Sequence, residues 1–137
     1  MQLWLIWTNT IKSFLEYQPL AKKPGTLPIQ MLTGPIFYRK LEKQATKEKT
    51  MAIFGLGDHI TYAGTFVDHI GLLAKELMSN GGVLVGQVPV NDYEFDDSDA
   101  VVDDKFLGLP VDEDFEPELT DERVNNWIEK IRPDFGF

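Results

Sequence analysis

Two glycines, an aspartate and a tyrosine lie close together in the stretch GLGDHITY, residues 55–62. Gly55 and Gly57 carry no Cβ atom, so the backbone there can approach a flat ligand closely and can adopt positive φ angles. Asp58 offers a hydrogen-bond acceptor, and Tyr62 offers a rigid aromatic face a few residues later. This combination suits a planar heterocycle that carries N–H groups at its edge.

An apolar run comes directly before these glycines, and a helical pattern follows them. Residues 51–54 predict a buried strand, and apolar residues at helical spacing over 66–77 predict a helix that ends at the Asn80-Gly81-Gly82 turn. Thr65 and Asp68 match a capping box, which predicts that the helix begins just after Thr65. A buried strand, a glycine-rich turn and a helix are the start of a parallel α/β crossover, where ligands bind at the carboxyl ends of the strands.

The remaining pattern predicts further strands and helices of an α/β fold. Residues 3–7 and the β-branched run 83–88 read as strands covered on both faces. An acidic, aromatic-bearing loop over 91–105 interrupts the second of these, and extended structure resumes over 106–111. A short basic helix is predicted over 36–45. A last helix begins with Thr120 as N-cap and has one apolar face, formed by Val124, Trp127, Ile128 and Ile131.

Length and composition restrict the classes of function. The 137 residues are enough for one domain with a core, and the absence of cysteine excludes disulfides, thiolate nucleophiles and cysteine metal sites. The acidic groups lack the glycine and distal glutamate of an EF-hand, so no metal site is predicted. The net charge is −9, and residues 51–137 carry nineteen of the 22 acidic side chains. Such a surface repels nucleic acid and attracts basic protein partners, or serves solubility alone.

The stretch G-x-G-D-x-x-x-Y, followed by the aromatic Phe66, resembles the flavin-contacting loop of the flavodoxins. Residues 92–98 and 100–109 are similar to the insertion and last strand of long-chain flavodoxins, and the similarity continues through 112–114 and 119–127. It covers residues 47–137 continuously. The resemblance implies a three-layer α/β/α fold with a parallel sheet, in one domain over 1–137. Residues 25–137 are then family-like, whereas 1–24 are divergent and the N-terminal elements are incomplete.

The resemblance also implies an FMN site. The implied cofactor contacts are Gly55, Leu56, Gly57, Asp58, His59, Tyr62 and Phe66 in the central stretch, with Thr8, Thr10 and Ser13 at the hydroxyl positions of a phosphate loop. Tyr62 would stack on the flavin, and its electron-rich ring would lower the reduction potential. Asp58 would lie near the pyrimidine edge, with neighbouring backbone N–H groups bonded to flavin carbonyls. Ile11 stands where the family has glycine in the phosphate loop.

Two histidines allow further interpretations. His59 stands where flavodoxins usually have glutamine, and a protonatable ring there could make flavin affinity depend on pH. The simpler expectation is that His59 is an exposed loop residue without a role. His59 and His69 are expected to lie in a loop and mid-helix, so they are not predicted to share a metal ion.

The function implied by the resemblance is that of a low-potential electron carrier. Such a protein binds FMN, passes single electrons between redox enzymes and catalyses nothing itself. It would be a cytoplasmic monomer that docks redox partners on its acidic surface, since the apolar residues 1–7 are too few to span a membrane. One alternative is an incomplete domain without cofactor, an interaction module or remnant that dimerises through an exposed sheet edge. Another is a flavin-dependent reductase, which would need a nicotinamide pocket.

Overall fold

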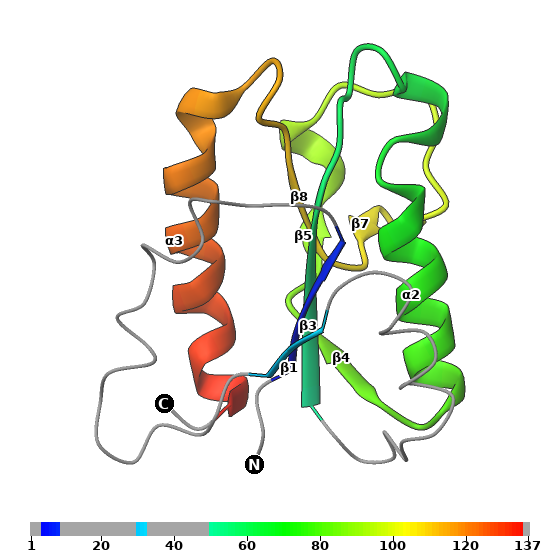
Figure 1. The fold of residues 1–137 in the computed structure, drawn as a ribbon, viewed down its shortest axis with the longest axis vertical. Helices are drawn as coiled ribbons and strands as arrows, with labels where there is room; N and C mark the ends of the chain where they lie inside the picture. The colour runs from blue at the N-terminus through cyan, green and yellow to red at the C-terminus, as the bar shows by residue number, and fades with distance from the viewer. Residues whose placement is uncertain (1–3, 9–29, 33–49, 136–137) are drawn as a thin grey trace.

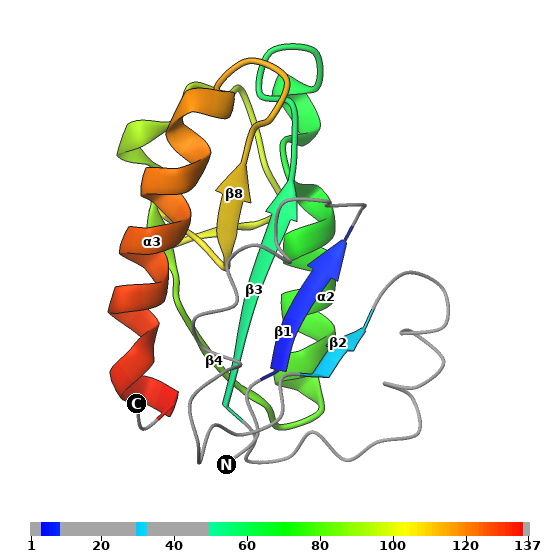
Figure 2. The same cartoon turned by 60° about the vertical axis from the view of Figure 1, so that its left-hand side comes forward.

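The computed structural model describes residues 4–8, 30–32 and 50–135 of the chain. Its main element is a parallel sheet of five strands (Figure 1 and Figure 2). The strands are β1 (Trp4–Thr8), β2 (Gln30–Leu32), β3 (Thr50–Leu56), β4 (Val83–Val85) and β8 (Leu109–Val111). Their order is β2-β1-β3-β4, and β8 also pairs with β3.

β3 is the central strand of this sheet. One of its edges pairs with β1, from Met51 opposite Trp4 to Gly55 opposite Thr8. The other edge is shared, because β4 lies beside the amino half of β3 and β8 beside its carboxyl half. β4 and β8 therefore occupy one strand position that is interrupted between them, as the sequence predicts.

The interruption, residues 86–108, is called the insertion from here on. It contains a small antiparallel sheet in the order β5-β7-β6, formed by β5 (Val88–Pro89), β6 (Val101–Val102) and β7 (Lys105–Phe106), with a 3-10 turn at Val90–Asp92. The parallel strand predicted over 83–88 is shorter, because Gly86 has a φ of 82° and turns the chain out of the sheet. The residues after Gly86 then pair within the insertion.

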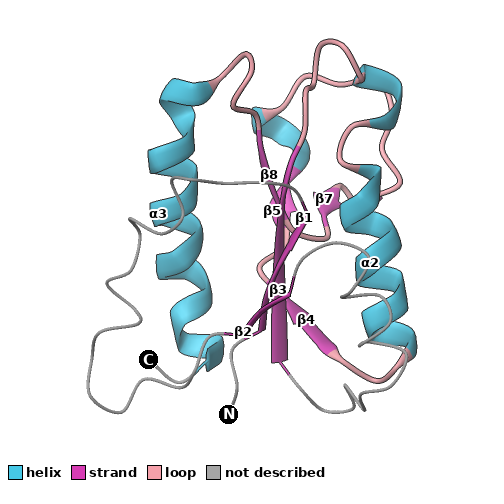
Figure 3. Ribbon diagram, in the orientation of Figure 1, coloured by secondary structure: helices cyan, strands magenta, loops and turns pink. Residues whose placement is uncertain are grey.

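Among the described residues, two helices cover the two faces of the sheet and complete three layers (Figure 3). They are α2 (Asp68–Ser79) and α3 (Thr120–Ile131). Side chains of β3 alternate between them: Met51 and Ile53 lie in the core cluster with α2, whereas Ala52 and Phe54 lie in the cluster with α3. This confirms the predicted α/β/α class and a central strand that is buried on both faces.

The predicted start of α2 is wrong. Thr65 ends a 3-10 turn, Ala63–Thr65, and α2 begins only at Asp68 after Val67, which has a φ of 49°. No side chain caps the helix at Val67. The Asp68 carboxylate instead accepts a hydrogen bond from the backbone N–H of Asp99 at 2.8 Å. A contact across the fold therefore replaces the local capping box.

The other helix ends are closer to prediction. α2 ends in a Schellman motif, with Gly81 N–H on Met78 O at 3.0 Å and Gly82 N–H on Leu77 O at 2.9 Å. α3 buries the predicted apolar face. Its N-cap is Leu119 rather than the predicted Thr120. The hydroxyl of Thr120 donates a hydrogen bond to a Glu113 carboxylate oxygen instead. Short 3-10 turns flank α3 at Pro117–Leu119 and Arg132–Phe135.

Three further observations relate the fold to the sequence. β1 confirms the strand predicted over 3–7, displaced by one residue, whereas β2 was not predicted. The basic helix predicted over 36–45 lies outside the described residues. Neither α2 nor α3 nor any other helix in the described ranges is long and apolar enough to cross a membrane.

Candidate functional site

A hollow of about 410 Å³ lies at the carboxyl ends of β3 and β8. One wall is the end of β3 and the segment 57–62, called the site loop, which contributes Leu56, Gly57, Asp58 and Tyr62. The opposite wall is the segment 112–115, called the acidic loop, which contributes Glu113 and Asp114. The segment that leads into α2 adds Thr65 and Val67, and the first turn of α2 adds His69. This is the predicted place for a ligand in a parallel sheet, and the volume suits a small molecule.

Tyr62 stands at this hollow with its side chain 63% exposed. Its backbone N–H is bonded to Asp58 O at 3.2 Å, so the site loop closes into a turn at this residue. An aromatic ring that is held at its backbone and open to solvent can stack on a planar ligand without a large rearrangement. The structure therefore places an exposed Tyr62 at the hollow, and its stacking on a ligand stays a prediction.

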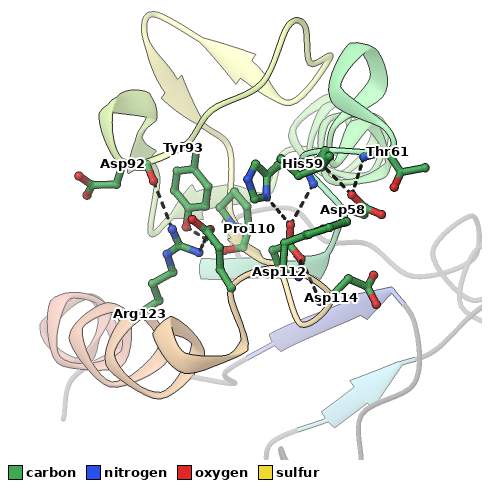
Figure 4. Close-up of polar contacts among 12 residues, drawn as sticks. Asp58, His59, Thr61, Asp92, Tyr93, Pro110, Asp112, Asp114 and Arg123 are labelled. Atoms are coloured by element: carbon green, nitrogen blue, oxygen red, sulfur yellow. Dashed lines mark hydrogen bonds and ion pairs between the residues drawn. The ribbon is translucent and has the colours of Figure 1, made fainter.

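The Asp58 carboxylate organises the same turn (Figure 4). Its Oδ1 accepts the backbone N–H of Ile60 at 3.0 Å and of Thr61 at 2.7 Å. Desolvation raises the pKa of Asp58, but the hydrogen bonds from Thr61 and Ile60 together outweigh it, so the pKa lies below its usual value. Asp58 is therefore an ionised acceptor at the edge of the hollow at neutral pH.

Five backbone N–H groups of the site loop have acceptors within the protein. Gly57 N–H bonds to Val111 O at 2.9 Å, and His59 N–H bonds to Asp112 Oδ2 at 3.0 Å. With the bonds made by Ile60, Thr61 and Tyr62, five N–H groups of this loop are engaged within the protein. These bonds fix the loop, and binding of ligand carbonyls by N–H groups beside Asp58 stays a prediction.

His59 is buried, and the expectation of an exposed loop histidine is wrong. The residue is 8% exposed and its Nδ1 is hydrogen-bonded to Asp112 Oδ2. The ring lies edge-on to Phe66 and to Phe115, with centroids 6.2 Å and 6.1 Å away. A residue of the site loop is thus inserted between the core and the acidic loop.

Asp112 is fully buried and receives hydrogen bonds on both carboxylate oxygens. Oδ2 accepts the two bonds from His59, and Oδ1 accepts the backbone N–H groups of Asp114 and Phe115, each at 2.9 Å. Burial raises the pKa of Asp112, but the hydrogen bonds outweigh burial and the pKa lies below its usual value. An ionised carboxylate has no proton to donate, so His59 Nδ1 carries the proton of their shared bond.

Asp112 was not predicted to be a site residue. The group Asp112-Glu113-Asp114 reads as part of the acidic surface in the sequence. One signal could have separated Asp112 from its neighbours: it is the first residue after the apolar stretch that forms β8, at the carboxyl end of a parallel strand.

His69 also lines the hollow, although the sequence did not assign it a role. It lies in the first turn of α2 rather than mid-helix, and its Nε2 is buried without a hydrogen-bond partner among the described residues. Burial lowers the pKa of His69, and the nearby Asp68 opposes that change only in part, so the neutral ring is favoured. A Cβ atom on Gly55 would lie 2.7 Å from this Nε2, which explains why glycine is needed there.

Four further predicted contact residues are Phe66, Thr8, Thr10 and Ser13. Phe66 is fully buried among Tyr93, Phe95 and Phe106 and does not line the hollow. Its ring packs against Gly57, because a Cβ atom on Gly57 would lie 2.9 Å from it. Direct ligand contact by Phe66 is thus corrected to support of the site loop. Thr8 ends β1 opposite Gly55. Thr10 and Ser13 lie outside the described residues.

A hollow at the carboxyl ends of parallel strands, in three layers α/β/α, defines a doubly wound ligand-binding fold. No protein-family model matches the chain. Flavodoxin from Picosynechococcus is 43% identical over 99 residues, which are 72% of this chain and 58% of that protein. Flavodoxin from Synechocystis is 43% identical over 97 residues, or 71% of this chain and 57% of that protein. Flavodoxin from Helicobacter pylori is 39% identical over 100 residues, or 73% and 60%.

Solved structures show the same fold. Flavodoxin from Fusobacterium nucleatum bound to flavin mononucleotide has a TM-score of 0.79 at 18% identity, covering 97% of this chain and 98% of that one. A lysine-to-glycine mutant of that flavodoxin, also bound to flavin mononucleotide, has a TM-score of 0.78 at 17% identity, covering 97% and 96%. The chain spans 57–60% of the length of the three sequence relatives named above. Over those residues its sequence is similar to that of the flavodoxins.

Proposed function

We propose that this chain binds FMN non-covalently in the hollow between the site loop and the acidic loop, and that it passes single electrons between redox enzymes. The observation that carries the proposal is the pairing of an exposed Tyr62 ring with the ionised Asp58 at one open hollow. Stacking on Tyr62 would cover one face of the flavin ring, and Asp58 would accept a hydrogen bond from its N–H edge.

The phosphate end of the cofactor would lie beyond β1. Thr8, the last residue of β1, lies opposite Gly55, so β1 ends at the same edge of the sheet as the site loop, and the segment 9–13 follows it in the sequence. Thr10 and Ser13 belong to that segment in the sequence and carry the hydroxyl groups that a phosphate requires. Ile11 would crowd a phosphate more than glycine does, which makes affinity the property to measure first.

FMN supplies the redox chemistry when bound, because it accepts and releases electrons one at a time. The chain supplies the electrostatic environment. Asp58, Glu113 and Asp114 place carboxylates around the hollow, and they oppose added negative charge there. The reduction potential should therefore be lower than that of free FMN.

The other properties follow from this role. The chain would perform no net reaction on a substrate and would act in the cytoplasm as a monomer with transient partners. Nineteen acidic side chains in residues 51–137 support docking of basic surfaces on redox proteins, with affinity that falls as salt rises. This proposal treats residues 1–137 as one domain, with 1–24 divergent.

Titration of the full chain with FMN tests the proposal. Flavin fluorescence should be quenched at a 1:1 endpoint, since stacking on tyrosine quenches it. The holoprotein should then accept electrons from a flavoprotein reductase with NADPH, yet should not oxidise NADPH alone. If FMN fluorescence stays unquenched at a millimolar concentration of the chain, and the chain elutes as a dimer in size-exclusion chromatography, the alternative of an incomplete domain without cofactor would be favoured. NADPH oxidation without a reductase would favour the flavin-dependent reductase.

A further inference from the structure

His59 occupies a position that the proposed function does not explain. Its side chain is 9% exposed, and His59 does not line the hollow, although Tyr62 and Asp58 of the same loop do. His59 directly follows Asp58 in the sequence, so the position of its ring constrains the backbone of the neighbouring residues in the site loop.

The bonds of His59 connect two loops that are distant in the sequence. His59 Nδ1 and His59 N–H both reach Asp112 Oδ2, a residue 53 positions away. The same Asp112 holds the acidic loop through the N–H groups of Asp114 and Phe115. One buried carboxylate therefore fixes both walls of the hollow at once (Figure 4).

The surroundings of the ring limit its freedom further. Phe66 from the core and Phe115 from the acidic loop stand edge-on to it, with interplanar angles of 74° and 81°. A ring held by apolar neighbours and one charge-assisted bond keeps a single orientation. A further bond, from Gly57 N–H to Val111 O at the end of β8, joins the site loop to the strand that leads into the acidic loop.

We propose that His59 is the positioning residue of this hollow: through its Nδ1 bond to buried Asp112 it holds the site loop against the acidic loop, and so presets Tyr62 and Asp58 for the ligand. The ligand part of this inference rests on the proposed function. The positioning part concerns the chain without ligand. Loss of the Nδ1 bond should let the two walls separate and should weaken binding without removing any ligand contact.

The test uses the full chain and two substitutions of His59. His59→Ala removes the side-chain donor but keeps the backbone N–H on Asp112. His59→Gln restores an uncharged N–H donor of sufficient reach. Ile60→Ala is the matched control, because Ile60 is 55% exposed in the same loop and does not line the hollow. Circular dichroism checks that each variant is folded.

Two readouts are needed. In the chain without FMN, amide hydrogen exchange at Gly57, Asp114 and Phe115 should be about tenfold faster in His59→Ala, and close to wild type in His59→Gln and Ile60→Ala. With FMN, His59→Ala should raise the Kd about tenfold, and His59→Gln should restore it to within about threefold. If glutamine restores both quantities, the effect of His59→Ala is due to the lost hydrogen bond and not to the lost side-chain volume.

The two proposals can fail separately. A folded His59→Ala variant with unchanged exchange at Gly57, Asp114 and Phe115 would overturn the positioning role, whatever FMN does. If the unaltered chain binds no FMN, the proposed function fails, and the exchange data alone decide the positioning role. If exchange changes as expected but the Kd for FMN does not, the two loops are coupled and the ligand part of the inference is wrong.

Discussion

The site loop and the insertion are held in place by different forces. The site loop, residues 57–62, is fixed by hydrogen bonds to Asp112, Val111 and Asp58, and most of its side chains remain accessible to solvent. The insertion, residues 86–108, is fixed mainly by aromatic side chains that lie in the core beside α2. Polar bonds position a surface while leaving it free to bind, whereas apolar burial stabilises the fold.

Phe66 joins these two regions. The centroid of its ring lies 5.8 Å from the ring centroid of Phe106 in the insertion and 6.2 Å from that of His59 in the site loop. The aromatic cluster therefore forms the base on which the site loop rests. Substitutions in the insertion should change stability first, and substitutions in the site loop should change binding first.

The largest effect on stability is expected from Phe106→Ala. Phe106 is fully buried and contacts the rings of Phe66, Tyr93 and Phe95 at centroid distances of 5.8, 5.2 and 5.1 Å. The cavity should lower the free energy of unfolding by about 3–5 kcal/mol, measured by urea denaturation. Val102→Ala in the same small sheet is the control, because Val102 is 45% exposed. Equal losses in the two variants would contradict the role assigned to the aromatic cluster.

The next largest effect is expected where the insertion meets α2. A Cβ atom on Gly71 would lie 2.2 Å from the backbone oxygen of Asp99, so the helix and the insertion touch through their backbones. Gly71→Ala should force them apart and should lower the free energy of unfolding by about 3 kcal/mol. The control is Gly64→Ala, where no atom lies within 4 Å of the added Cβ. A Gly71→Ala variant as stable as the Gly64→Ala variant would show that this contact is loose.

A smaller effect with a characteristic pH dependence is expected from Asp112→Asn. Asp112 is fully buried and accepts four hydrogen bonds, so neutralising it should cost about 2 kcal/mol of unfolding free energy at pH 7. Its pKa is lowered in the folded chain, so the unfolded chain takes up the proton first as the pH falls below 3.8. The stability that Asp112 contributes is therefore present above that pH and lost below it.

Urea denaturation at pH 7 and at about pH 3 measures this dependence. The difference in unfolding free energy between wild type and Asp112→Asn should shrink at the lower pH. Asp114→Asn, in the exposed part of the same acidic loop, should show no comparable pH-dependent difference. A wild-type minus Asp112→Asn difference that stays constant between the two pH values would mean that Asp112 is not held ionised by its partners.

Much of the fold could be predicted because its signals are local. The apolar run of β3, the apolar face of α3 and the glycines that end α2 are each read within one stretch of sequence. The start of α2 was mispredicted for the opposite reason. Asp68 matches a capping box locally, but its carboxylate is used by Asp99, 31 residues away.

The site residues show the same contrast between local signals, which could be predicted, and contacts across the fold, which could not. Gly57, Asp58 and Tyr62 were selected because glycine, acceptor and aromatic ring stand within a few residues, and all three line the hollow. The pair of His59 and Asp112 was missed because 53 residues separate its members, and no spacing rule joins a loop histidine to a carboxylate in another loop. Phe66 was misassigned since an aromatic residue near a binding motif fits a ligand contact as well as a core position.

The smallest effect on stability, and the sharpest test of the division between the two regions, is expected from Tyr62→Ala. Because Tyr62 is 63% exposed, its removal should change the unfolding free energy by about 0.5 kcal/mol or less. If its ring stacks on FMN, the same substitution should weaken FMN binding by about tenfold, whereas Tyr62→Phe should bind nearly as wild type. Fluorescence titration and urea denaturation of the same samples compare the two quantities. Unchanged FMN affinity in Tyr62→Ala would remove the ring from the site, and a large loss of stability would place Tyr62 among the residues that support the fold. A loss of affinity without a loss of stability is the result that separates a binding surface from the core beneath it.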